Sequence, residues 1–111
     1  MTLEQWKAIY YAIPASEAIG SDADALEHSL WKWIGFREKT PQGFNGMGTC
    51  ALCRRYYTSV SGCLGCPLGR AGKSCAEVNS PYGIFDKTGN PEPMIEALAE
   101  LLDIELAKEE I

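Results

Sequence analysis

Four cysteines form two Cys-x-x-Cys pairs, and they are the residues of this chain best suited to chemistry. Cys50 and Cys53 make the first pair, Cys63 and Cys66 make the second, and nine residues separate the pairs. Each pair can bend into a tight turn that points both sulfur atoms at one ion, and two such turns complete a tetrahedral site of four thiolates. The spacing therefore predicts one structural zinc ion bound by these four residues.

The supply of metal ligands limits the chain to a single site. Five cysteines and one histidine are too few for two independent sites of four ligands each. The fifth cysteine, Cys75, can take the place of Cys63 or Cys66 as a ligand; otherwise we expect it to be a small buried thiol. The histidine, His28, is expected to pack on a helix rather than to bind the metal.

An iron–sulfur cluster is the alternative metal centre. Cys66-Pro67 matches the Cys-Pro that ends the cysteine run of bacterial ferredoxins. That run requires three closely spaced cysteines, whereas the cysteines of this chain come in separated pairs. The spacing therefore favours zinc.

The triplet Gly72-Lys73-Ser74 matches the end of a phosphate-binding loop. That loop also needs a glycine at position 67, where this chain has Pro67. No buried apolar strand precedes the triplet, so the sequence disfavours nucleotide hydrolysis.

Basic residues surround the cysteines, and they are Arg54, Arg55, Arg70 and Lys73. They can offset the negative charge of a zinc ion with four thiolates, or they can contact phosphate or an acidic partner. Residues 37–75 carry six bases and one acid, whereas residues 76–111 carry two bases and nine acids. Because the acidic segment repels a phosphate backbone, we expect docking on a protein rather than on nucleic acid.

The expected partner-binding residues are aromatic and arginine side chains, the types that dominate the energy of protein interfaces. They are Trp31, Arg54, Arg55, Tyr56 and Tyr57. Trp31 is included because Trp33 follows two positions later, and side chains at that spacing project in different directions on a helix. The alternative function is a nucleic-acid-binding module, similar to a zinc ribbon, that uses the basic residues 37–75.

Two helices are expected before the cysteines. Thr2 and Gln5 fit a capping box, which predicts a helix from about Leu3 to about Ile13, where Pro14 follows. Ser21 or Asp22 can cap a second helix, which should end near residues 37–39. Its apolar stripe is expected at three- and four-residue spacing: Ala23, Leu26, Leu30, Trp33 and Ile34.

One helix is expected after the cysteines. Asn90 is a good cap and Pro91 fits the first helical position, so the helix should run to about Lys108. Its apolar residues should face the core: Ile95, Leu98 and Leu102. Its acidic residues should lie in water: Glu96, Glu100, Glu109 and Glu110.

The middle of the chain lacks helical or strand periodicity. Only Arg55-Tyr56-Tyr57-Thr58 weakly predicts a short extended piece that could pair as a hairpin. We therefore expect a single small α-rich domain over residues 1–111, α+β at most, stabilised by zinc. Helices in residues 1–39 and an acidic amphipathic helix in residues 90–111 should flank an irregular, knuckle-like centre in residues 40–89.

The compartment follows from hydropathy and cysteine number. No apolar run approaches the roughly 20 residues that span a bilayer, so we expect no membrane partner. An odd number of cysteines disfavours a disulfide framework and favours a reducing cytoplasm.

A longer ordered pattern includes the cysteine pairs. It reads Ser29-x-x-Lys32-Trp33, Cys50-Ala-Leu-Cys53, Cys63-x-x-Cys66-Pro67, Cys75 and Ser80-Pro81-Tyr82, followed by an acidic helix. In this pattern, over roughly residues 26–108, the chain resembles a group of small cysteine-rich proteins found in bacteriophage and prophage genomes. The resemblance brings no activity with it, but it implies a phage-encoded protein in a bacterial cytoplasm and places Cys75 inside the shared pattern.

Taken with the resemblance, the residues favour a non-enzymatic, zinc-stabilised interaction module. Its expected partner is a host or phage protein, which it would bind and modulate.

Overall fold

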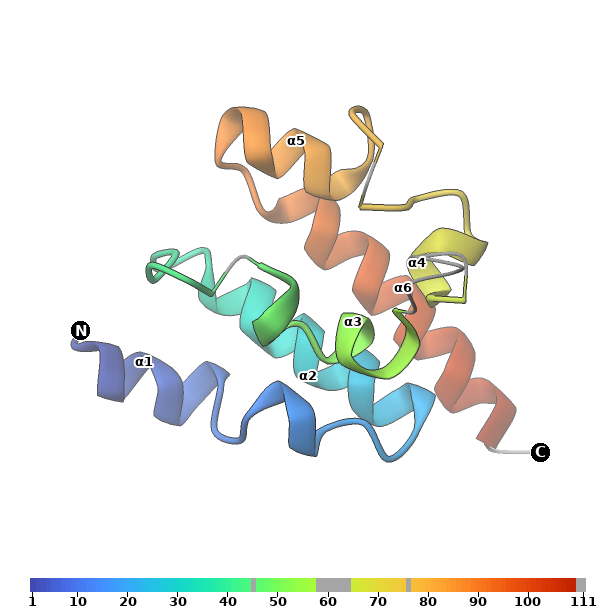
Figure 1. Ribbon diagram of the computed structural model, residues 1–111, viewed down its shortest axis with the longest axis horizontal. Helices are drawn as coiled ribbons and strands as arrows, with labels where there is room; N and C mark the ends of the chain where they lie inside the picture. Colours follow the sequence, from blue (N-terminus) through green and yellow to red (C-terminus); the bar gives the residue numbers. More distant parts are fainter. Residues whose placement is uncertain (45, 58–64, 76, 110–111) are drawn as a thin grey trace.

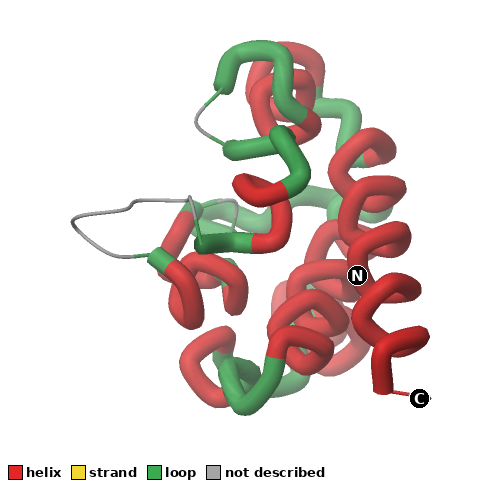
Figure 2. Tube along the Cα trace, turned by 90° about the vertical axis from the view of Figure 1, so that its right-hand side faces the viewer, coloured by secondary structure: helices red, strands yellow, loops and turns green. Residues whose placement is uncertain are grey.

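The computed structural model describes residues 1–44, 46–57, 65–75 and 77–109, which form helices joined by short turns (Figure 1). In chain order the helices are α1 (Leu3–Tyr10), η1 (Ala15–Glu17), α2 (Asp22–Gly35), η2 (Met47–Thr49), α3 (Ala51–Tyr56), α4 (Pro67–Arg70), α5 (Pro81–Thr88) and α6 (Glu92–Glu109). These ranges contain no strand (Figure 2), and the radius of gyration is 13.3 Å, as expected for a folded chain of this length. The prediction of a small α-rich fold is confirmed.

The predicted hairpin is wrong where the structure can test it. Arg55 and Tyr56 form the end of α3, and Thr58 lies outside the described residues. The segment Ala51–Tyr56 contains good helix formers, and the carbonyl oxygen of Cys50 accepts a hydrogen bond from the Arg54 amide (3.0 Å). Local helix propensity therefore wins over the extended tendency of the tyrosines.

The first helix begins at the predicted capping box but ends three residues early. Thr2 Oγ1 accepts a hydrogen bond from the Gln5 amide, and Gln5 Oε1 accepts one from the Thr2 amide. Pro14 disfavours a helical conformation at the residue before it, so α1 ends at Tyr10. The chain then turns into η1.

Helix α2 occupies the middle of the molecule. Ser21 caps it, as predicted, by accepting a hydrogen bond from the Asp24 amide. It packs against α1, α3 and α6 (Figure 1). Because neighbours cover it on several sides, α2 buries polar as well as apolar residues: Ala25, Leu26, Ser29, Lys32, Trp33 and Gly35.

Aromatic rings join the N-terminal helices to α5. The Trp33 ring lies 4.8 Å from the rings of both Phe36 and Phe85, measured between ring centroids. Trp6 of α1 stacks on Phe36 at 6.0 Å, and its Nε1–H donates to the Gly35 carbonyl oxygen (2.9 Å). One continuous aromatic core thus holds together segments far apart in sequence.

Helix α5 was not predicted, although its sequence carries both end signals. Ser80 Oγ accepts a hydrogen bond from the Gly83 amide (3.1 Å), and Pro81 stands at the first helical position. Gly89 ends the helix with a φ of +75°, a conformation that glycine adopts without strain.

Helix α6 packs on the predicted face. Ile95, Leu98 and Leu102 are buried, whereas Glu96 and Glu100 are exposed. Asn90 Oδ1 accepts a hydrogen bond from the Glu92 amide and so caps the helix. The side chains of Glu109 and Glu110 lie outside the described residues. In the part of the chain that the structure describes, no helix is long and apolar enough to cross a bilayer.

Replacing Leu98 by alanine tests the assignment of the buried face. Leu98 is fully buried, so Leu98→Ala should lower the free energy of unfolding by about 2–5 kcal/mol. Glu100→Ala, on the exposed face, should change it by less than about 0.5 kcal/mol. Urea unfolding followed by circular dichroism measures both values, and an equal loss in the two variants would contradict the assignment.

Replacing Gly35 tests the close contact between α1 and α2. A Cβ atom at Gly35 would lie 2.6 Å from Tyr10 Cγ and 2.8 Å from Trp6 Cζ2. Gly35→Ala should therefore destabilise the protein by about 1–3 kcal/mol, although alanine favours helices. Gly46→Ala is the control, because a Cβ atom there meets nothing within 4 Å. Equal melting temperatures for the two variants would show that the contact is loose.

Candidate metal centre

The described cysteines come from three separate segments of the centre. Cys50 is the N-cap of α3, and Cys53 lies three residues later in the same helix. Cys66 is the N-cap of α4, and Cys75 lies in the turn that follows α4. Short helices therefore position three of the four sulfur atoms, where the sequence predicted irregular structure.

These four cysteines line one small cavity. Its volume is about 10 Å³, and Leu52, Tyr57, Leu68 and Gly69 complete its wall. Cys50 and Cys66 are buried, and Cys53 and Cys75 are partly buried. A space of this size is close to that of one water molecule or one ion.

Cys75 lies among the cysteines of this cavity, whereas Cys63 lies outside the described residues. The predicted zinc ligands were Cys50, Cys53, Cys63 and Cys66, with Cys75 as a substitute. The structure brings Cys50, Cys53 and Cys66 together, and it places Cys75 beside them.

The four thiols at the cavity do not form a complete group of metal ligands as they stand. Among residues 1–44, 46–57, 65–75 and 77–109, no three or more His, Cys, Asp or Glu side chains form a group that could hold a metal ion. Zinc–sulfur bonds are about 2.3 Å long. A zinc site therefore requires the sulfur atoms to close in on the cavity from their positions here.

A buried lysine accompanies the cysteines. Lys32 of α2 is only 1% exposed. Burial lowers the pKa of its ammonium group, and thiolates at Cys50, Cys53 and Cys75 oppose that shift. The Lys32 Nζ atom also lies 5.8 Å from the centroids of the Trp33 and Phe36 rings. The thiolates of the cysteine cavity and the rings of the aromatic core thus both act on Lys32.

The pKa of Cys50 is well below its ordinary value. The main cause is a hydrogen bond from the Cys53 side chain, which outweighs the opposing effect of burial. The positive charge of Lys32, the Cys53 amide and the Ser29 hydroxyl lower the pKa further; Ser29 Oγ lies 3.8 Å from Cys50 Sγ. The surroundings of Cys50 therefore favour the thiolate, the form that binds metal.

The sequence missed Lys32 as a member of this site. Four buried residues follow one another at spacings of four, three and four positions along α2 and its C-cap: Ala25, Ser29, Lys32 and Phe36. The available sequence signal was that Ser29 and Lys32, two polar residues, occupy positions in this stripe. Because lysine is rarely buried without a partner, that signal did not point to a buried Lys32. Basic residues were expected instead at four other positions: Arg54 and Arg55 in α3, Arg70 in α4, and Lys73 after α4.

Two of those expected basic residues make internal contacts. Arg55 Nε pairs with Asp22 Oδ1 (2.9 Å), which joins α3 to the start of α2. The Tyr56 hydroxyl donates a hydrogen bond to the same carboxylate. Arg54 Nε donates to the Gly48 carbonyl oxygen (3.1 Å). These three residues, predicted to bind a partner, all help to hold α3 in place.

The other two predicted partner residues lie at different sites. Tyr57 is 49% exposed and lies at the cysteine cavity. Trp31 is 47% exposed and lines a groove between α1 and α2.

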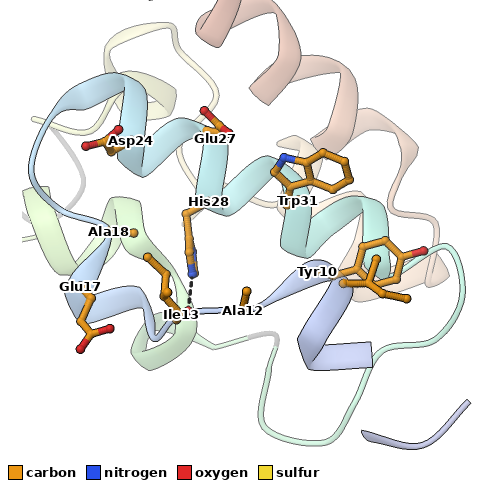
Figure 3. Close-up of a pocket in the computed structure, with 10 residues that line it drawn as sticks. Tyr10, Ala12, Ile13, Glu17, Ala18, Asp24, Glu27, His28 and Trp31 are labelled. Carbon is orange, nitrogen blue, oxygen red and sulfur yellow. Dashed lines mark hydrogen bonds between the residues drawn. The ribbon is translucent and has the colours of Figure 1, made fainter. Parts of the chain in front are cut away.

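His28 lies in that groove, and its environment agrees with the expected packing role. Its Nε2–H donates to the Ile13 carbonyl oxygen at 2.8 Å (Figure 3). The Tyr11 ring contacts the imidazole edge-on at 4.9 Å.

Three residues outside the wall of the cysteine cavity interact with its cysteines: Ser29, Lys32 and Tyr82. Ser29 and Lys32 approach it from α2, and the Tyr82 ring lies 6.0 Å from the Trp33 ring. Burial raises the pKa of Tyr82, and Asp86 and the nearby thiolates raise it further. Residues separated by more than fifty positions therefore act on one small volume.

Comparison of the chain with models of protein families, with curated proteins and with solved structures finds no match in any of the three.

Proposed function

We propose that the protein is a non-enzymatic, zinc-stabilised module that binds another protein. One observation carries the proposal: four cysteines from three segments line a single small cavity beside a buried lysine. Thiolates in this number and spacing suit zinc, which binds tetrahedral sets of cysteine ligands.

The proposed ligands are Cys50, Cys53, Cys66 and Cys75. Together they would connect α3, α4 and the turn after α4, where the chain between residues 40 and 80 offers few large apolar side chains. A zinc ion with four thiolates carries excess negative charge, and Lys32 supplies a positive charge within the protein. A buried charge is costly unless an opposite charge is near, so Lys32 and the thiolates stabilise one another.

The charges support a protein partner over nucleic acid. The chain carries a net charge of −5, and several of its bases already pair with carboxylates. Arg37 Nε lies 2.6 Å from Glu92, and Lys73 Nζ lies 3.8 Å from Glu100. These pairs leave less positive charge for a phosphate backbone. The resemblance to phage and prophage proteins supports a host protein, in a bacterial cytoplasm, as the partner.

Metal analysis and single cysteine substitutions test the proposed centre. We expect about one zinc per chain, because structural zinc in small domains contributes about 10–16 kcal/mol to folding. Cys75→Ser should lose zinc and lower the melting temperature sharply, whereas Cys63→Ser should keep both near the native values.

The opposite pattern would restore Cys63 as the ligand. Less than about half an equivalent of zinc would contradict the zinc centre. Iron with a visible absorption band would show an iron–sulfur cluster instead.

Replacing Lys32 tests its role as the compensating charge. Lys32→Met keeps the packing but removes the ammonium group, so zinc affinity should fall about 10–100-fold, the usual cost of losing a residue that supports metal ligands. The metal-free protein should not lose stability, because a buried charge has been removed.

Competition with a chromophoric chelator measures zinc affinity, and exposed Lys87→Met is the control. Unchanged zinc affinity in Lys32→Met would show that the lysine serves packing alone.

A further inference from the structure

A groove lies on the side of α2 that does not face the cysteines. The end of α1, the turn at residues 11–14, η1 and α2 form its walls, and its volume is about 500 Å³ (Figure 3). Ten residues line it: Ile9, Tyr10, Ala12, Ile13, Glu17, Ala18, Asp24, Glu27, His28 and Trp31.

Large apolar side chains stand exposed in this groove. Ile9 is 54% exposed, Ile13 is 45% exposed and Trp31 is 47% exposed. Single exposed apolar residues are common, but several in one concave site mark a surface that another molecule covers. A volume of about 500 Å³ accepts a few side chains from one face of a helix.

The charges of the groove are all of one sign. Glu17, Asp24 and Glu27 are exposed, and no lysine or arginine lines the site. Within the described ranges, none of these carboxylates forms an ion pair. Asp24, Glu27 and Trp31 follow one another at spacings of three and four residues, so they share one face of α2.

We propose that this groove binds a basic, amphipathic helical segment of a partner protein. The proposal deepens the protein-binding function above by stating the chemistry of the partner. Apolar residues of the segment enter between Ile13 and Trp31. An arginine of the segment lies over the Trp31 ring and pairs with Glu27, one helical turn away on α2. This arginine neutralises the carboxylate and covers the face of the indole ring.

Other occupants fit the groove less well. Three carboxylates repel a nucleic-acid backbone. A second copy of the chain would have to supply its arginines, and three of the four are already held: Arg37 by Glu92, Arg55 by Asp22 and Arg54 by the Gly48 carbonyl oxygen, which leaves Arg70. An acidic or neutral segment would leave the carboxylates beside Trp31 without a partner.

Selection from a displayed library of random peptides tests the chemistry of the ligand. Peptides of about 16 residues, long enough to form a helix on binding, are selected on the zinc-supplemented full chain. The selected peptides should be rich in arginine or lysine, with leucine, phenylalanine or methionine at three- and four-residue spacing. Their arginine-to-glutamate versions should bind at least about tenfold more weakly, as fluorescence anisotropy will show. Selection of acidic or uncharged peptides, or of none, would overturn the proposal.

Variants of the protein test the location of the site. Trp31→Ala and Glu27→Lys should each weaken binding of the selected peptide at least about tenfold. Both residues are exposed, so the melting temperature should stay within a few degrees of the native value. Ile104→Ala and Glu96→Lys, at exposed residues of α6 outside the groove, are the matched controls and should bind as the native chain does. Loss of binding in Tyr57→Ala, with Trp31→Ala unaffected, would place the docking surface at the cysteine cavity.

Two further measurements separate the failure of this proposal from failure of the zinc centre. Zinc content is measured on each sample. A chain that lacks zinc but binds the peptide supports the groove and contradicts the zinc centre. A chain that holds zinc but does not bind the peptide supports the zinc centre and contradicts the groove. Sedimentation of the protein alone should show a monomer. A dimer that Trp31→Ala dissociates would show that a second copy fills the groove and would overturn the proposal.

Discussion

A lysine side chain buried inside the protein is the constraint on which the rest of the structure depends. Lys32 is almost wholly buried, its Nζ atom lies 5.8 Å from the centroids of two aromatic rings, and thiolates of the centre oppose the lowering of its pKa by burial. An ammonium group in such a place is stable only if negative charge or strong dipoles lie close to it. The central loops must therefore bring the cysteines to α2.

The contacts of α3 show how this is achieved. Ala51 and Leu52 are buried, while Arg55 and the Tyr56 hydroxyl both bind Asp22 at the start of α2. The helix is thus held by its apolar residues on one side and by a carboxylate at its end. This placement puts Cys50 beside Cys53 and Ser29; the hydrogen bond from the Cys53 side chain is the main cause of the low pKa of the Cys50 thiol, and Lys32 and Ser29 lower that pKa further.

Features set by neighbouring residues could be predicted from the sequence. The capping box at Thr2, the cap at Ser21 and the apolar face of α6 all depend on residues within a few positions of one another, and all three are confirmed. The two Cys-x-x-Cys pairs predicted a common site, and the structure brings Cys50, Cys53 and Cys66 to one cavity. Helix α5 could also have been found, since Ser80-Pro81 and Gly89 mark its ends.

Features that depend on long-range contacts could not be predicted in this way. Burial of Lys32 depends on thiols that lie 18 or more positions away in the chain, and general rules place lysine at the surface. The internal role of Arg55 depends on Asp22, 33 residues earlier. The sequence showed that these residues were charged, but not which partner each would find.

The groove and the cysteine cavity draw on different parts of the chain. Every residue of the cavity wall lies between positions 50 and 75, whereas one wall of the groove comes from α1, the turn after it and η1. The Trp6 side chain donates a hydrogen bond to the Gly35 carbonyl oxygen and so holds that wall against the C-terminal end of α2. The same contacts that fill the aromatic core therefore also fix one wall of the groove, so a change at Trp6 or Gly35 would alter the core and the groove together.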